Sequence, residues 1–260
     1  MDARLKLLPL LFWACSAWGF DHGHAAWDAL LKKHVVVIDE GRASRVDYAG
    51  MAQDRPALTQ YLAALASVGE GEFNAWTREQ RMAFLINAYN AFTVEKILMR
   101  YPNLRSIWDF GRIFSNPFRD AFFQLLGAPA SLDTIEHEIL RKRYRDPRIH
   151  YAVNCASIGC PMLREEAYVA ARLGEQLDAQ AQRFLSDRSR NRAREGRLEV
   201  SRIYEWFRED FEPLPGYFVA YAGLLADDPA QQKLVFERKA AITFLDYDWS
   251  LNDSRSSSPR

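Results

Sequence analysis

One stretch of the sequence, residues 77–100, constrains the fold more than any other. Thr77 is followed three positions later by Gln80, the pattern of a capping box, and Pro102 stops the helix that this pattern begins. Inside it, residues 84–92 (FLINAYNAF) are apolar almost all round. A helix that is apolar on every face must be surrounded by other elements, so we predict a central, buried helix here.

Two amide side chains interrupt this apolar segment. Asn87 and Asn90 lie three positions apart, on neighbouring faces of the predicted helix. A buried amide without hydrogen-bond partners costs roughly 1–3 kcal/mol, so both side chains must be bonded. Either they tie neighbouring loops to the helix, or one of them orients a catalytic group or donates to an oxyanion. The sequence leaves both interpretations open.

The other informative stretch is Asp146 to Pro161, DPRIHYAVNCASIGCP. An Asp-Pro turn leads into residues 149–153, which are short and β-prone, and we predict a buried strand there. The run then breaks at Asn154-Cys155 into small residues. A polar, thiol-bearing break directly after an apolar strand is where α/β-type sheets often place their chemistry.

The rest of the chain predicts helices and strands without a repeat or a linker. Expected helices span 25–34, 56–68, 132–142, 174–185 and 217–225, with a helix end at 206–211, and expected strands span 35–38, 197–200 and 244–252. Residues 106–130 are aromatic and irregular, and we expect short strands and a long loop that walls a groove. We predict one helix-rich α+β domain, residues 20–253, with the central helix packed on a small, mostly antiparallel sheet. A cysteine-peptidase-like fold is one form of this prediction.

The composition favours a folded protein. Of the 260 residues, 48% are hydrophobic, which is ample for a full core. Lys and Arg number 34 and Asp and Glu number 34, so the balance of charge gives no support to nucleic-acid binding or to a polybasic membrane surface. Residues 254–260 are polar and are expected to be a disordered tail.

Residues 1–19 have the parts of a signal peptide. A weakly positive start precedes a short apolar core, and Ala17-Trp18-Gly19 is a small-x-small cleavage site, so we place the mature start at Phe20. This predicts export to the periplasm or the extracellular space, with no integral membrane segment after signal removal, because no later run approaches ~18 apolar residues. A lipoprotein alternative would use Cys15, although the residues before it match the usual pattern poorly.

Export would leave two cysteines, Cys155 and Cys160. In an oxidising compartment they could simply form a disulfide. A thiol nucleophile, in contrast, needs a base, and the base needs a third group that holds its ring. Asp133 and His137 lie four positions apart on the predicted helix 132–142, so their side chains share a face. We therefore predict Cys155 as nucleophile, His137 as base and Asp133 as its orienting group.

Other roles remain open at this point. Asn87 or Asn90 would polarise the substrate carbonyl, Glu136 is an alternative orienting group, and Cys160 has the position of a supporting residue. His150 is the other candidate base, but strand alternation places it on the opposite face from Cys155.

Metal and cofactor sites have less support. Zinc could use Cys155, Cys160, His137 and His150, but the Cys-x4-Cys spacing is wide and the histidines lie on separate elements. The His22-Gly23-His24 sequence better fits a solvated terminus than a metal site, because it lacks further ligands. Gly69-Glu70-Gly71 lacks the lysine and helix of a phosphate loop. We predict no cofactor and no metal.

Several blocks resemble domain-of-unknown-function family 547, in order along the chain. They are residues 84–91 (FLINAYNA), 131–137 (SLDTIEH), 149–157 (IHYAVNCAS), 200–207 and 244–252. The resemblance covers Trp27 to Asn252 and implies an exported bacterial protein of a largely uncharacterised family, whose plant members carry the domain behind a coiled-coil region.

The resemblance also favours some of the candidate site residues over others. Positions matching Asn87, Asn90, His137 and Cys155 are the recurrent polar ones in the family, whereas those matching His150 and Cys160 vary, and a serine can replace Cys160. This implies a site built on Cys155 and His137 rather than an obligatory disulfide. It is consistent with a cysteine-peptidase-like or permuted papain-like site, although His before Cys reverses the order in papain.

Two functional hypotheses follow. The first is an exported thiol hydrolase or acyl transferase acting on an amide, peptide or thioester bond through Cys155, His137 and Asp133. The second is a non-enzymatic cell-envelope binding domain, in which the aromatic stretch from Trp108 to Phe123 lines a peptide or glycan groove. In that case Cys155 and Cys160 would be bonded or buried.

Overall fold

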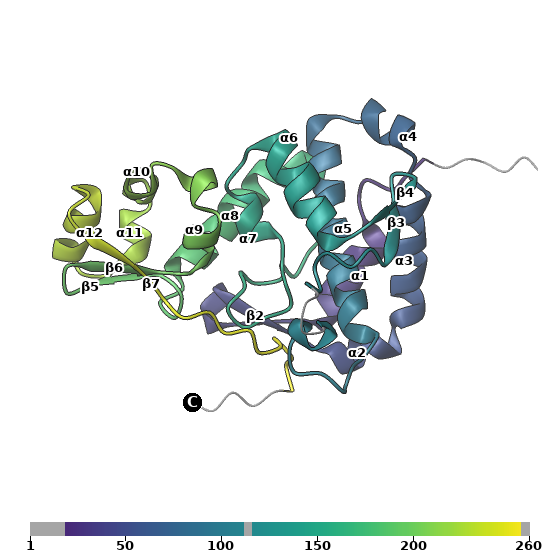
Figure 1. Ribbon diagram of the computed structural model, residues 1–260, viewed down its shortest axis with the longest axis horizontal. Coiled ribbons are helices and arrows are strands. Elements are labelled where there is room, and N and C mark those ends of the chain that lie inside the picture. Colours follow the sequence, from purple (N-terminus) through teal and green to yellow (C-terminus); the bar gives the residue numbers. More distant parts are fainter. Residues whose placement is uncertain (1–18, 112–115, 256–260) are drawn as a thin grey trace, which may run out of the picture.

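Helix α5, Arg78–Leu98, is the longest helix in the part of the chain that the computed structural model describes, residues 19–111 and 116–255. The capping box at its start is present, because the Thr77 side chain accepts from the Gln80 N–H and the Gln80 side chain accepts from the Thr77 N–H. Every residue from Met82 to Val94 is buried. The predicted central, buried helix is confirmed (Figure 1).

The elements around α5 are mostly helical, which narrows one prediction. It packs against α2 (Tyr48–Gln53), α3 (Arg55–Ser67), the π-helix η3 (Thr134–Arg141) and the 3-10 turn η4 (Ala170–Arg172). The predicted packing on a sheet is limited to one small strand pair, where Phe92 of α5 stacks on Phe123 with 3.8 Å between ring centroids. The strands are only three or four residues long, too short to cover a helix of 21 residues.

Three small sheets replace the single sheet that we expected. Two are antiparallel pairs, β1–β2 (Val35–Ile38, Ala43–Val46) and β3–β4 (Phe123–Leu125, Ala128–Ala130). The third is mixed: β6 (Arg197–Val200) pairs antiparallel with β5 (Arg192–Arg194) and parallel with β7 (Ala241–Phe244). The described chain is therefore helix-rich α+β with small antiparallel and mixed sheets.

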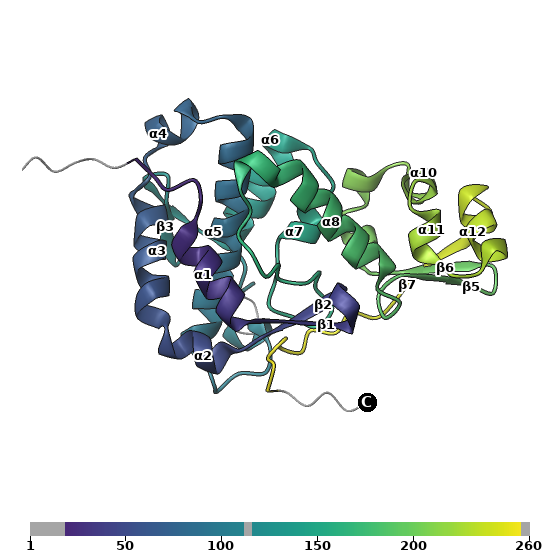
Figure 2. The ribbon, with the colours of Figure 1, turned by 180° about the vertical axis from the view of Figure 1, so that it is seen from behind.

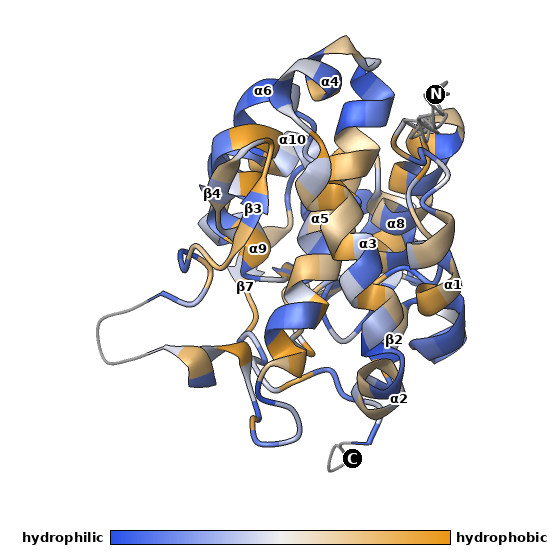
Figure 3. Ribbon diagram, turned by 90° about the vertical axis from the view of Figure 1, so that its right-hand side faces the viewer, coloured by the Kyte–Doolittle hydropathy of each residue, from blue (hydrophilic) through white to orange (hydrophobic). Residues whose placement is uncertain are grey.

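The remaining helices complete two packed groups. They are α1 (Ala25–His34), η1 (Asp39–Gly41), α4 (Glu70–Ala75), η2 (Ile107–Phe110), α6 (Lys142–Tyr144), α7 (Ile149–Ala152), α8 (Leu173–Ser186), α9 (Ile203–Trp206), η5 (Arg208–Phe211), α10 (Leu214–Val219), α11 (Ala222–Leu225) and α12 (Pro229–Phe236). Helices α1 to α5 lie at one end of the molecule, and β5–β7 with α10–α12 lie at the other (Figures 1 and 2). In Figure 3 the hydrophobic colours of α5 lie inside, whereas α6 is hydrophilic and lies outside.

Helix α8 joins the two groups. Its first half contributes Leu173 and Leu177 to the larger core around α5, and its second half contributes Phe184 and Leu185 to a smaller core around Tyr204. Each core buries large apolar side chains, which is the dominant favourable term in folding. One helix therefore fixes the C-terminal group relative to the N-terminal group.

The predicted strand at residues 149–153 is wrong, because the chain forms the short helix α7, Ile149–Ala152. The Asp146 side chain accepts from the Arg148 N–H, which starts a turn. The backbone carbonyl groups of the same turn then accept from the next residues, the carbonyl of Pro147 from the His150 N–H and that of Arg148 from the Tyr151 N–H. This local hydrogen bonding outweighs the β-propensity of a five-residue run.

The predicted closing strand, residues 244–252, was wrong in its bounds. Pairing with β6 ends at Phe244, after which residues 245–253, the closing segment, run extended past the cysteines (Figure 1). At the start of the predicted tail, the Ser254 N–H donates to the Val46 carbonyl at 2.9 Å. The predicted signal peptide, apart from Gly19, and residues 256–260 lie outside the described residues. No helix in the described ranges is long and apolar enough to cross a bilayer.

Candidate functional site

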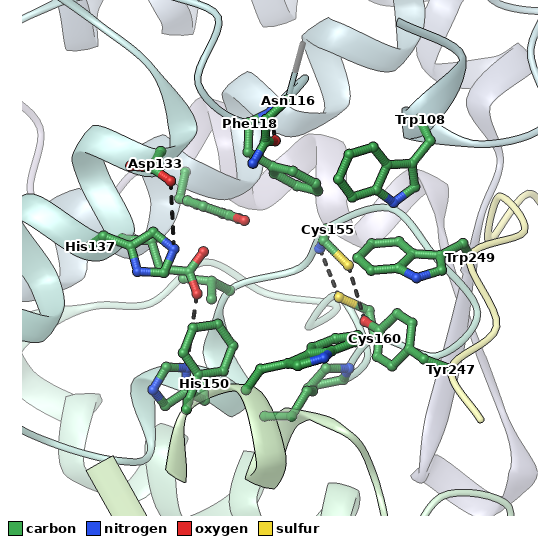
Figure 4. A pocket seen from close by; sticks show the side chains of 17 residues that line it. Trp108, Asn116, Phe118, Asp133, His137, His150, Cys155, Cys160, Tyr247 and Trp249 are labelled. Carbon is green, nitrogen blue, oxygen red and sulfur yellow. Dashed lines mark hydrogen bonds and ion pairs between the residues drawn. The ribbon is translucent and has the colours of Figure 1, made fainter. Parts of the chain in front are cut away.

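A cavity of about 500 Å³ lies where seven segments of the chain meet, and Figure 4 shows it from close by. Its size falls within the usual range for small-molecule sites. Its described lining consists of Tyr89, Trp108, Asn116, Phe118, Asp133, Glu136, His137, His150, Val153, Cys155, Cys160, Pro161, Ile203, Trp206, Phe207, Tyr247 and Trp249. Most of this lining is apolar or aromatic, with thiols on one side and a cluster of acidic and imidazole groups on the other.

The cysteine segment, residues 153–161, is held in place by buried amides. The Asn90 side chain donates to the Ala152 carbonyl and accepts from the Asn154 N–H, at 2.9 and 2.8 Å. The Asn154 side chain in turn accepts from the Ala156 N–H at 2.9 Å. Ala156 has a φ of 62°, a left-handed conformation that an alanine adopts at a cost. This turn directs Cys155 toward the cavity.

The Cys155 thiol is free, half-buried and surrounded by hydrogen-bonding groups. Its Sγ lies 3.1 Å from the Ser157 hydroxyl oxygen and 3.2 Å from the Tyr247 hydroxyl oxygen. Burial would raise the pKa of Cys155, but hydrogen bonds from Cys160, Ser157 and Tyr247 outweigh it and lower that pKa below the usual thiol value. A thiol with a lowered pKa is more readily ionised, and the thiolate is the nucleophile.

The neighbouring thiol behaves in the opposite way. Cys160 is buried and forms no disulfide with Cys155. Its Sγ accepts a hydrogen bond from the Cys155 N–H at 2.8 Å. Burial, followed by the adjacent Cys155, raises the pKa of Cys160 well above the usual value. Cys160 therefore keeps its proton more readily than Cys155 does.

The closing segment brings Tyr247 to the thiol. It runs beside the cysteine segment through hydrogen bonds from the Ile158 N–H to the Ser250 carbonyl and from the Gly159 N–H to the Asp248 carbonyl, both 2.8 Å. Gly159 allows the close approach, because a Cβ there would lie 3.0 Å from the Asp248 nitrogen.

The opposite wall of the cavity is built on the π-helix η3, Thr134–Arg141, which follows a turn closed by the Ser131 hydroxyl. π-helical turns are rare and are frequent at functional sites. His137 Nε2 lies 3.7 Å from Asp133 Oδ1, an ion-pair distance, and Arg141 lies 2.9 Å from His137 Nδ1. Because a guanidinium can only donate, His137 accepts at Nδ1, and its neutral ring carries the proton on Nε2.

His150 belongs to a separate network. Its Nε2 lies 2.6 Å from Asp210 Oδ2, which also accepts from Arg141 Nε at 2.5 Å. Burial lowers the pKa of His150. Burial opposes ionisation of Asp210, but the bonds from His150 and Arg141 lower its pKa to about 2. The His150 ring stacks on Phe207 with 4.2 Å between centroids.

Glu136 lies between the two imidazoles and is buried. Its Oε1 is 3.9 Å from His150 Nδ1. Burial raises the pKa of Glu136 above the usual carboxyl value, against the opposing charge of His137. This carboxyl group is therefore more readily protonated than an exposed one.

The comparisons with known proteins bear on this same region. Residues 73–185 match the model of a family described as "Protein of unknown function, DUF547". The predicted family resemblance is confirmed. The DUF547 match includes α5, η3 and the cysteine segment, whereas Trp206 and Tyr247 lie beyond it. No curated protein and no solved structure matches the chain.

Three of the predicted residues meet at the cavity. Cys155, His137 and Asp133 all line it, from the cysteine segment on one wall and from η3 on the other (Figure 4). The sulfur, however, makes its described hydrogen bonds to two hydroxyl groups and to the Cys160 thiol, and to neither imidazole. Glu136, His150 and Cys160 line the cavity as well.

The two predicted amides lie outside the described lining. Asn87 donates to the Tyr168 carbonyl and accepts from the Tyr168 N–H, at 2.7 and 3.0 Å. Asn90 binds the cysteine segment. Both asparagine side chains therefore tie neighbouring loops to the central helix.

Sequence reasoning missed two hydroxyl groups and one ion pair. Ser157 stands two positions after Cys155, a local signal that was available. Tyr247 and the Arg141–Asp210 pair join segments distant in sequence, and no local spacing pattern indicates such contacts. No group of three or more His, Cys, Asp or Glu side chains in residues 19–111 and 116–255 is arranged to hold a metal ion.

Proposed function

We propose that this protein is an exported thiol-dependent hydrolase or acyl transferase that acts on an amide, peptide or thioester bond. One observation carries the proposal: the free Cys155 thiol, with hydroxyl partners at 3.1 and 3.2 Å, opens onto an apolar cavity whose other wall presents His137 and Asp133. The cysteine-peptidase-like arrangement is part of the proposal as a likeness in chemistry.

The reaction begins with the Cys155 thiolate. Its sulfur attacks the carbonyl carbon of the substrate, a C–S bond forms, and the bond to the leaving amine or thiol breaks. A protonated His137 gives one proton to the leaving group and becomes a neutral imidazole. Water, or an acceptor amine or thiol, then attacks the acyl-enzyme and loses a proton to His137, which releases the acyl product and restores the Cys155 thiolate.

The two walls of the cavity have different roles in this scheme: one favours ionisation of the thiol, and the other positions the imidazole. Ser157 and Tyr247 favour the thiolate, so Cys155 does not need an imidazole in contact with it to ionise. Asp133 and Arg141 flank the two ring nitrogens of His137. The contact with Arg141 must break when the ring is protonated, because a guanidinium can only donate. A substrate in the cavity would lie between the sulfur and this imidazole, which explains why the two groups are not in contact without one.

Alkylation with iodoacetamide across a pH series, with mass mapping of both cysteines, tests the proposal. We expect Cys155 to be modified selectively, with a midpoint below the ~8.5 of a free thiol, while Cys160 stays unmodified. Cys155→Ser is the matched control, because it keeps Cys160 and should abolish the modification that occurs at low pH. Modification of both cysteines only after reductant is added would contradict the proposal, as would an ordinary midpoint for Cys155.

A second candidate is the non-enzymatic cell-envelope binding domain. It is favoured by the aromatic lining of the cavity and by the hydroxyl, rather than imidazole, contacts of Cys155. Thiol release from a simple thioester distinguishes the two candidates. An acyl transferase releases the thiol at a rate that depends on Cys155, whereas a binding domain releases none.

Export is part of both proposals. Residues 1–19 have the signal-peptide pattern, and the described chain from Phe20 on packs against Trp76 and Phe84. Expression of the full chain in a bacterium with separation of periplasm from cytoplasm tests this. We expect a periplasmic protein that begins at Phe20, and a cytoplasmic protein that keeps Met1 would contradict it.

A further inference from the structure

The cavity carries a feature that the thiol chemistry does not use. Five aromatic side chains form one side of it, which we call the aromatic wall: Trp108, Phe118, Trp206, Tyr247 and Trp249. Trp249 is its centre, since its ring lies 5.3 Å from that of Trp108, 5.7 Å from that of Trp206 and 4.6 Å from that of Tyr247. Figure 4 shows Trp249 and Tyr247 beside Cys155.

Two members of the aromatic wall remain unusually open to solvent. Trp108 is 40% exposed and Trp206 is 44% exposed, although both line the cavity. They come from η2 and α9, segments almost a hundred positions apart, and both pack on Trp249. Large exposed aromatic groups gathered at a cavity are typical of surfaces that a ligand covers.

The charges around the cavity define what such a ligand carries. None of the 17 described lining residues is Lys or Arg, so this described part of the lining offers no permanent cation to a carboxylate or phosphate. The two carboxyl groups of the described lining are either paired or buried. Asp133 lies 3.5 Å from Arg119 and 3.7 Å from His137, and the Glu136 carboxyl group is buried. The lining therefore favours an uncharged group.

We propose, on the basis of the thiol function proposed above, that the bond attacked by Cys155 is flanked by an uncharged aromatic group that packs on the aromatic wall. An aromatic side chain buries about 150–250 Å² and gains further from offset or edge-to-face contacts with other rings. The position of Tyr247 in both the wall and the thiol site places such a group next to the reacting carbonyl.

Protection of Cys155 from iodoacetamide tests this inference without requiring turnover. The probes are N-acetyl-phenylalaninamide, N-acetyl-lysinamide and the α-amide of N-acetyl-glutamate, which share a backbone and differ only in side chain. We expect the aromatic probe to slow alkylation at a concentration at least about fivefold below that needed for the charged probes. Equal protection by all three, or strongest protection by the glutamate or lysine probe, would overturn the inference.

Variants of the aromatic wall test whether the aromatic probe binds there. Trp206→Leu and Trp108→Leu, which change exposed residues in two different segments, should each weaken protection by the aromatic probe about fivefold. Phe236→Leu is the matched control, because Phe236 is 65% exposed on α12 and outside the lining, and it should leave protection unchanged. Unchanged protection in both tryptophan variants would contradict the proposed position of the ligand.

The two proposals fail separately. Aromatic protection together with no Cys155-dependent release of thiol from the phenylpropionyl thioester of N-acetylcysteamine would retain the aromatic site and refute the enzyme. Thiol release from the phenylpropionyl, glutaryl and trimethylammoniobutyryl thioesters at equal rates would retain the enzyme and refute the aromatic preference.

Discussion

The hydroxyl oxygen of Tyr247 lies 3.2 Å from Sγ of Cys155, although 92 positions separate the two residues. Together with the Ser157 hydroxyl at 3.1 Å, it gives the sulfur polar partners on a cavity wall that is otherwise mostly apolar. A hydrogen bond to an ionised group is stronger than one to a neutral group, so these hydroxyls favour the thiolate. The lowered pKa of Cys155 therefore comes from Cys160, Ser157 and Tyr247, and so in part from the closing segment, not from an imidazole.

Tyr247→Phe should raise the pKa of Cys155. The substitution keeps the ring packed against Trp206 and Trp249 and removes only the hydroxyl that favours the thiolate. Alkylation of Cys155 at pH 7 should slow by about three- to tenfold, because a hydrogen bond to a charged group contributes about 1.5–3 kcal/mol and part of it is replaced by Ser157.

The matched control for this change is Tyr221→Phe, which removes a partly buried tyrosine hydroxyl from the smaller core. It should leave the rate of Cys155 alkylation as in the wild type. If Tyr247→Phe also leaves the rate and its pH midpoint unchanged, the hydroxyl does not stabilise the thiolate.

His137→Gln separates ionisation of the thiol from proton transfer. Because His137 makes no described contact with the Cys155 sulfur, alkylation of Cys155 should keep its wild-type pH midpoint. Turnover of a thioester or amide should fall by about 10²–10⁴-fold, the usual contribution of a general acid–base residue. A shift of the alkylation midpoint to that of a free thiol would instead show that His137 forms an ion pair with Cys155 in solution.

The fold was predictable from sequence where local patterns are strong. The capping box and the all-round apolar run of α5 specify a buried helix without reference to the rest of the chain. The same holds for the helix Leu173–Ser186, which has an apolar face, and for the hairpin strand Val35–Ile38. Short runs are different. Residues 149–153 have β-prone side chains, but hydrogen bonds begun by Asp146 make them helical.

The site was predictable only in part, for a related reason. Asp133 and His137 were paired because four positions separate them in one helix, and Cys155 was chosen for its place after an apolar run. Whether the two groups touch depends on how η3 and the cysteine segment pack, which no local pattern specifies. Tyr247 reaches the thiol only because residues 245–253 return beside Ile158 and Gly159, a long-range pairing invisible to spacing arguments.

A pH dependence of stability should come from His24. This residue is buried, with one ring nitrogen 2.8 Å from the Tyr61 hydroxyl, and burial lowers its pKa to about 4. The unfolded chain, with a pKa near ~6.5, binds the proton more readily than the folded chain. Stability is therefore fully present above about pH 6.5 and falls by about 3 kcal/mol as the pH drops to about 4.

His24→Asn tests this assignment. Asparagine tolerates the left-handed backbone at this position, where φ is 50°, and does not titrate. Denaturant unfolding at pH 7 and pH 4.5 measures the free energy of unfolding for both chains. The variant should lose less stability between the two pH values than the wild type, and equal losses would show that His24 does not titrate in the folded chain.

Gly159→Ala should separate the closing segment from the cysteine segment. The added Cβ would lie 3.0 Å from the Asp248 nitrogen and 3.0 Å from two Tyr247 ring carbons, so the chain at residues 247–248 must shift. Overpacking of this kind costs about 1–3 kcal/mol in free energy of unfolding. Because the shift also moves the Tyr247 hydroxyl from the sulfur, alkylation of Cys155 at pH 7 should slow, as in Tyr247→Phe.

Gly174→Ala is the matched control for Gly159→Ala. Gly174 lies in the first turn of α8, where an added Cβ meets nothing within 4 Å. An alanine there should raise the free energy of unfolding by about 0.5 kcal/mol, because glycine is the poorer helix former, and should leave Cys155 alkylation unchanged. Wild-type stability and alkylation in Gly159→Ala would mean that the two segments do not pack closely, and the place of Tyr247 at the thiol would lose its support.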